Sequence, residues 1–202
     1  MRYPNAKNGV NKLFIAIIIS LAAAGLDFIA SIILIASWGF ETAPYYAFLF
    51  MSEGASVAAA VFTILGLKIA ARDNRTFDKA VTWTIVGIAA GFGGALFGVI
   101  PFIGWLFEMA GSIVAIIANY ISITTILQGC TELLQNSYFT QKASTIRTLL
   151  IVAIVLISVG AVFSPIPFVG ILGWLASIGG AVVSIVYEVF YLLFIIRAKN
   201  AL

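Results

Sequence analysis

The sequence predicts an all-helical, polytopic integral membrane protein whose six transmembrane helices form three hairpins within a single domain, residues 1–202. The first observation is composition: 62% of the 202 residues are hydrophobic and only 9% are charged. Soluble domains have about a quarter of their residues charged. A soluble globule and a nucleic-acid-binding module are therefore excluded, so the expected surroundings are the lipid bilayer, with no nucleic-acid partner despite the net charge of +3.

The second observation is that the charges are spaced so that six long apolar runs lie between them. A membrane-spanning helix needs about 20 mostly apolar residues. Short links between consecutive runs predict antiparallel pairs, with hairpin units at about 13–70, 80–127 and 149–196. The six runs are Leu13–Trp38, Tyr45–Ala70, Ala80–Ile100, Trp105–Leu127, Leu149–Ile166 and Ile171–Ile196.

The third observation is the distribution of positive charge. All eleven Lys and Arg residues fall before the first run, after the sixth, or around the links that join the second to the third run and the fourth to the fifth. The opposite links carry none. This is the positive-inside pattern, which predicts cytoplasmic N- and C-termini in a cytoplasmic (inner) membrane. The longest polar link, Thr131–Thr148, is expected either to form a short helix along the membrane surface or to dock a cytoplasmic partner.

Two of the hairpins share a sequence motif. Ile100–Gly104 reads IPFIG, and Ile166–Gly170 reads IPFVG. The match favours an internal repeat of hairpins inserted in the same sense, with proline turns in the outer links. Parallel repeats build some transporters, but duplicated hairpins that simply pack well give the same pattern.

Small residues recur at helical spacing in five of the runs. Helices in lipid associate by close backbone contact, which small residues permit. We expect these stripes to face the interior of the bundle. The packing candidates are Gly87, Gly91, Gly94 and Gly98 in the third run, Gly111 in the fourth and Gly180 in the sixth, and the first run has Ser20, Ala24, Asp27 and Ser31 at the same spacing.

Four strongly polar residues lie well inside the runs, away from their ends, namely Asp27, Glu53, Asn119 and Glu188. Ionisable residues inside a membrane are energetically costly and mark substrate or ion pathways. No Lys or Arg lies deep enough to neutralise the three acids, so each is protonated, holds a cation, or reaches water in a cavity. The four residues are the candidates for a substrate or ion pathway, while the plain alternative is that each is a hydrogen-bonded packing device.

The leading functional hypothesis is small-solute transport, either as a transporter or as the substrate-binding subunit of one. It predicts a water-accessible cavity that touches both Asp27 and Glu53. The alternatives are a non-catalytic structural or accessory subunit, which binds another membrane protein or a second copy through small-residue faces, and an oligomeric ion channel. Enzyme activity is not expected, because the sequence has no His, one Cys and no phosphate-binding loop; no cofactor and no metal site are expected either.

Overall fold

The computed structural model describes residues 3–38, 40–163 and 170–202. It confirms the all-helical class: six helices are long and apolar enough to cross a membrane, and the described residues contain no strand. The helices are α1 (Pro4–Ala36), α2 (Ala43–Ala70), α3 (Thr76–Gly98), α4 (Gly104–Leu134), α5 (Ser137–Phe163) and α6 (Gly170–Ala201).

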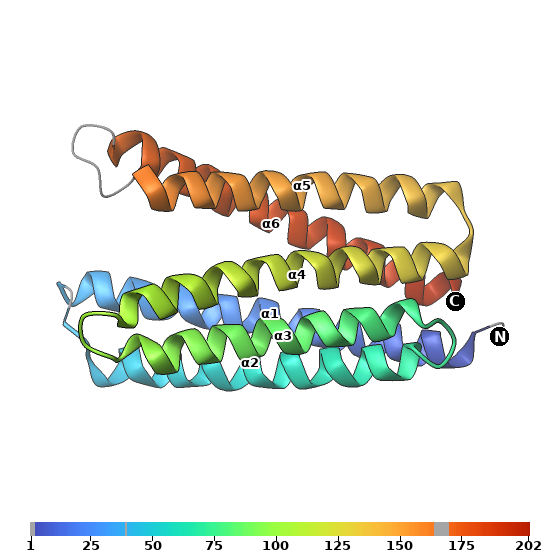
Figure 1. Ribbon diagram of the computed structural model, residues 1–202, viewed down its shortest axis with the longest axis horizontal. Helices are drawn as coiled ribbons and strands as arrows, with labels where there is room; N and C mark the ends of the chain where they lie inside the picture. The colour runs from blue at the N-terminus through green and yellow to red at the C-terminus, as the bar shows by residue number, and fades with distance from the viewer. Residues whose placement is uncertain (1–2, 39, 164–169) are drawn as a thin grey trace.

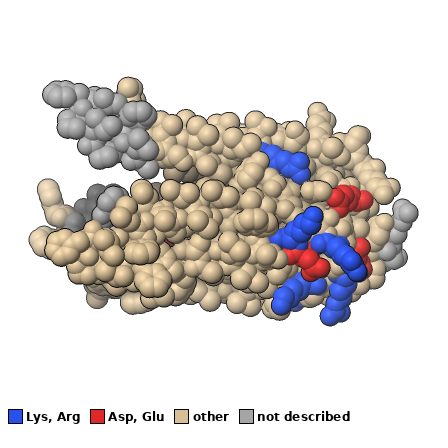
Figure 2. All heavy atoms as spheres, viewed as in Figure 1, with Lys and Arg blue, Asp and Glu red and all other residues tan. Residues whose placement is uncertain are grey.

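The helices pair with their neighbours in the chain. The contacts between α1 and α2, between α3 and α4, and between α5 and α6 are far more extensive than any between hairpins. Figure 1 shows the three antiparallel pairs side by side, with both termini at the same end of the bundle. Lys and Arg side chains gather toward that end in Figure 2, which we therefore name the charged end.

Helices at the charged end extend further than the apolar runs. α1 begins at Pro4 rather than Leu13, and α4 continues to Leu134. The expectation of a separate surface helix within 131–148 is wrong, because only Gln135 and Asn136 separate α4 from α5. Gln135 ends α4 in the left-handed conformation (φ 47°), and Asn136 Oδ1 accepts a hydrogen bond from the Tyr138 backbone N–H at 2.9 Å, as N-cap residues do. Polar composition there marks helix ends and not a loop.

The proline-containing links are described only in part. Pro44 lies in the first turn of α2, where its missing N–H costs no hydrogen bond. Pro101 lies between α3 and α4, next to Phe102, which has a positive φ of 68°. The corresponding turn at Pro165 and Pro167, with most of the second copy of the repeated motif, lies outside the described residues.

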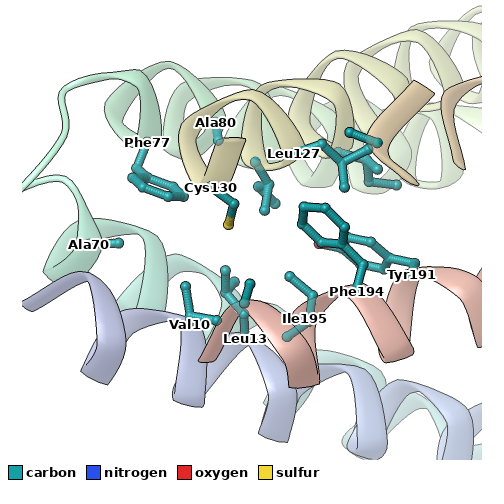
Figure 3. Close-up of a cluster of buried hydrophobic side chains, with 14 of the residues drawn as sticks. Val10, Leu13, Ala70, Phe77, Ala80, Leu127, Cys130, Tyr191, Phe194 and Ile195 are labelled. Carbon is teal, nitrogen blue, oxygen red and sulfur yellow. The ribbon is translucent and has the colours of Figure 1, made fainter. Parts of the chain in front are cut away.

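A cluster of buried apolar side chains fills the bundle near the charged end (Figure 3). Phe77, Leu127, Cys130 and Ile195 are fully buried there. All six helices contribute to this cluster, and the buried residues by which α5 and α6 reach the other four helices lie in the halves of those helices near the termini. The third hairpin is therefore attached mainly at the charged end, and Figure 1 shows it diverging from α4 toward the opposite end.

Within the second hairpin, α3 and α4 approach closely through small residues. A Cβ added to Gly111 would lie 2.6 Å from the carbonyl oxygen of Ala90 and 2.7 Å from Cα of Gly94. Gly87 faces Ala118, and Gly91 lies near Ala115. In the third hairpin, an added Cβ on Gly180 would lie 2.7 Å from Cγ1 of Ile157. The remaining packing candidate, Gly98, is the last residue of α3.

The first hairpin packs through a face that differs from the expected one. Ala23 is buried while Ala24 is exposed, and Ala16 and Ala30 continue the buried face at seven-residue intervals. Near the charged end, a Cβ on Gly9 would lie 2.4 Å from the carbonyl oxygen of Gly66. The stripe expected in α1 was assigned by spacing alone, and several small residues in a row leave that spacing ambiguous by one position.

Two polar clusters tie the link between α2 and α3 to other helices. Asp73 accepts hydrogen bonds from Asn5 Nδ2 at 2.8 Å and from the backbone N–H of Ala6 at 2.7 Å, which connects the link to the start of α1. Glu132 of α4 accepts from Asn74 Nδ2 at 2.8 Å and from Thr76 Oγ1 at 2.7 Å. Hydrogen bonds to charged groups are stronger than neutral ones, so these clusters join the first two hairpins at the charged end.

We expect Gly111→Ala to destabilise the protein by about 1–3 kcal/mol, because the atoms that its methyl group would meet are backbone atoms that cannot swing aside. Gly93→Ala is the matched control, since an added Cβ there meets nothing within 4 Å. Thermal unfolding of both variants in the same detergent measures the difference. Equal unfolding temperatures for the two variants would contradict this packing.

The Asp73 cluster predicts a pH dependence of stability. Burial raises the pKa of Asp73, but the hydrogen bonds from Asn5 and the Ala6 backbone outweigh it and hold the pKa below its ordinary value. The carboxylate therefore stabilises the fold above the unfolded-state pKa of about 3.9, and this contribution is lost as the pH falls through the lower folded-state value. We expect Asp73→Asn to lower the unfolding temperature at neutral pH, and the two proteins to converge as the medium is acidified. A difference that is the same at every pH would count against this role.

Candidate functional site

A cavity of about 580 Å³ lies among the helices, on the side of the buried cluster away from the termini. Residues of α1, α2, α3, α4 and α6 line it. Its volume is in the range of pockets that hold small organic ligands, about 300–1,000 Å³. The cavity wall and the buried cluster share three residues, Leu13, Ile126 and Tyr191. Tight packing therefore closes the cavity toward the charged end.

Two of the four predicted pathway residues line this cavity. Glu188 comes from α6 and is partly buried, and Asn119 comes from α4. Among the described residues neither side chain has a hydrogen bond or an ion pair. Both groups are therefore available to whatever occupies the cavity.

The other two candidates do not line it. Asp27 of α1 and Glu53 of α2 are exposed and are not part of this cavity's wall. The transport hypothesis predicted a cavity that touches both Asp27 and Glu53, and this cavity touches neither. The physical reason is visible in α2: Ser52 is buried, and the next residue along a helix is rotated by about 100°, which carries Glu53 away from that contact.

The wall formed by α3 and α4 contains a hydrogen-bonded pair that sequence reasoning did not identify. The Thr84 hydroxyl lies 2.7 Å from the Ser122 hydroxyl, and it donates to the carbonyl oxygen of Ala80 at 2.8 Å. Ser122 is buried and belongs to the same small-residue face as Ala118. Both hydroxyl groups already have hydrogen-bond partners. The pair therefore positions the two helices and leaves little hydrogen-bonding capacity for a ligand in the cavity.

Aromatic side chains form another part of the wall. Tyr187 and Tyr191 lie one turn apart on α6 with nearly parallel rings, centroids 6.1 Å apart and an interplanar angle of 10°. Each is only 8% exposed, and neither hydroxyl has a hydrogen-bond partner among the described residues. Trp83 of α3 adds a third ring. The sequence offered one signal for this group, namely the two tyrosines on either side of Glu188 in α6.

The remainder of the cavity wall is mainly aliphatic, with Leu and Ile side chains from α1, α3 and α4, and it also contains the hydroxyl groups of Ser20, Ser56 and Thr63. No Lys or Arg belongs to the described wall. Among the described residues, no three His, Cys, Asp or Glu side chains lie close enough together to hold a metal ion. The site thus combines one acid, one amide and several hydroxyl groups with aromatic and aliphatic surfaces.

Six long apolar helices define the chain as a multi-pass membrane protein. Comparison with protein-family models, curated proteins and solved structures finds no match for the chain. Its function has to be argued from the cavity.

The cavity predicts selective chemical access. We expect the cysteine of Asn119→Cys to react with a small water-soluble thiol reagent in the folded protein, because Asn119 is exposed to the cavity. Native Cys130 should stay unmodified, since it is fully buried. Ala118→Cys, one residue away and fully buried in the wild type, is the control. Mass spectrometry of the intact protein gives the extent of labelling, and an unreactive Asn119→Cys would argue that water does not enter.

Proposed function

We propose that this protein binds a small solute in the cavity between its hairpins, as a transporter or as the substrate-binding membrane subunit of one. The observation that carries the proposal is the presence of Glu188 and Asn119, without protein partners among the described residues, in the wall of a cavity of about 580 Å³. Polar groups that serve only to hold helices together are expected to hydrogen-bond across to a neighbouring helix.

The energetics of polar groups support a bound solute. A charged side chain at the centre of a bilayer costs about 2.5–3.5 kcal/mol on insertion scales. Polar groups away from bulk water are normally hydrogen-bonded. Glu188 and Asn119 are relieved of this cost if water or a polar solute contacts them, and a solute that does so gains affinity and specificity from the same contacts.

We propose the orientation from the distribution of charge. Positive residues are retained on the cytoplasmic side of a membrane, so the charged end, with both termini, faces the cytoplasm of a cell whose inner membrane holds the protein. The buried cluster around Phe77, Leu127 and Cys130 then closes the cavity on the cytoplasmic side. The solute would enter from the opposite side, where the third hairpin diverges.

A structural or accessory subunit is the second candidate. An added Cβ on Gly25 of α1 or Gly54 of α2 would meet nothing within 4 Å, so these helices present small residues that the chain itself leaves uncovered. Such positions suit close approach by another membrane helix, either from a partner or from a second copy. The Gly111 and Gly180 contacts, in contrast, are satisfied within the chain.

The test of solute binding is to fill the cavity. Ser56 lines it, whereas Ser112 is exposed on α4 outside it. We expect wild type and Ser112→Trp to be stabilised by at least one member of a panel of amines, amino acids, sugars and nucleosides, by about 2.7 kcal/mol at a hundred times the dissociation constant. Ser56→Trp should lose that stabilisation. Thermal unfolding in detergent reads out binding, and uptake into proteoliposomes reads out transport.

Two results would reject the proposal. One is that no member of the panel stabilises the wild type. The other is that Ser56→Trp binds solutes as the wild type does. Self-association or capture of a membrane partner that is lost in Gly54→Leu, without any solute binding, would favour the accessory subunit.

A further inference from the structure

We infer that the solute is an organic monocation, a single positive charge carried on an apolar body such as a quaternary ammonium compound. This inference rests on the proposed function, because it assigns a chemical class to the ligand of the same cavity. Charge, polarity and aromatic content of the described wall each point to that class.

Charge is the first argument. Glu188 is the one acidic residue among the described residues of the wall, and no Lys or Arg of the described wall opposes it. An anionic solute would meet this acid with no countercharge. A solute with one positive charge supplies the ion-pair partner that Glu188 lacks, and a carboxylate in partly apolar surroundings interacts with such a partner more strongly than it would in water.

The small number of acidic groups in the wall favours an organic cation over a bare metal ion as the occupant. Hard cations such as Ca²⁺ take six to eight oxygen ligands, with carboxylates prominent among them. The described wall has one carboxylate, its other polar groups are neutral amide and hydroxyl groups, and no three His, Cys, Asp or Glu side chains among the described residues could hold a metal ion. A water molecule occupies about 30 Å³ in the liquid, so 580 Å³ is far more volume than a single ion needs. An organic body fills the volume and contacts the aliphatic surface.

Aromatic rings supply the third argument. Trp83, Tyr187 and Tyr191 lie in the wall with Glu188. Aromatic faces attract cations through the ring quadrupole, and quaternary ammonium groups are recognised in proteins by clusters of such rings. The two tyrosines flank Glu188 in the same turn region of α6, so the acid and two rings are held by one rigid element.

The experiment compares a cation with its uncharged isostere. Choline and 3,3-dimethylbutan-1-ol have the same shape, but only choline is charged. We expect the full-length protein in detergent to bind choline more tightly than the alcohol in isothermal titration calorimetry. Glu188→Gln should lower the choline affinity about tenfold or more, as expected when a charge loses its desolvated partner, and leave the affinity for the alcohol unchanged. Tetraethylammonium and benzyltrimethylammonium extend the test to larger cations.

Two control variants separate this inference from the proposed function. Glu53→Gln removes an exposed acid outside the cavity wall and should leave choline binding unchanged. Ser56→Trp should abolish binding of cation and alcohol alike. If neutral solutes bind and Ser56→Trp blocks them, but no cation of the three binds better than the alcohol or Glu188→Gln has no effect, the organic-cation inference is wrong and the solute-binding proposal stands. If Ser56→Trp blocks nothing, both fail.

Discussion

Close contact between helix backbones within each hairpin is the constraint on which the rest of this structure depends. Lipid removes the usual advantage of burying apolar side chains against each other, so small residues such as Gly94 and Gly111 have to bring the helices together. Three tight pairs result. Contacts between the pairs are sparser and concentrate at the charged end, where the buried cluster draws on all six helices. A cavity exists because packing is dense within the hairpins and incomplete between them.

The polar residues acquire their roles from this uneven packing. Thr84 and Ser122 lie where two paired helices touch, and they satisfy each other. Glu188 and Asn119 line the cavity that the three hairpins leave between them, and among the described residues they have no such partner. The same residue types thus serve packing in one place and recognition in another, and the distance between helix pairs decides which.

Much of the fold was predictable from the sequence because it depends on local patterns. Apolar runs between charges indicate six spans, and short links indicate antiparallel pairs. The small-residue spacing in α3 and α4 identifies Gly87 and Gly111 as contact positions. The site was harder to predict from the sequence. Which acids share a cavity depends on how the hairpins pack against one another, and that packing involves residues distant in the sequence. Polarity alone therefore selected Glu188 and Asn119, which line the cavity, together with Asp27 and Glu53, which do not.

The polar connections at the charged end have a mechanical consequence. Asp73 and Glu132 connect the link after α2 to α1 and to α4, so four helices form one frame. From the hairpin of α5 and α6, the guanidinium of Arg147 donates a hydrogen bond from Nη2 to the carbonyl oxygen of Thr124 in that frame at 3.2 Å. Attachment of the third hairpin to this frame therefore depends mainly on apolar packing in the buried cluster, to which the contact of the Lys199 ammonium with the Phe14 ring, 4.6 Å from its centroid, adds.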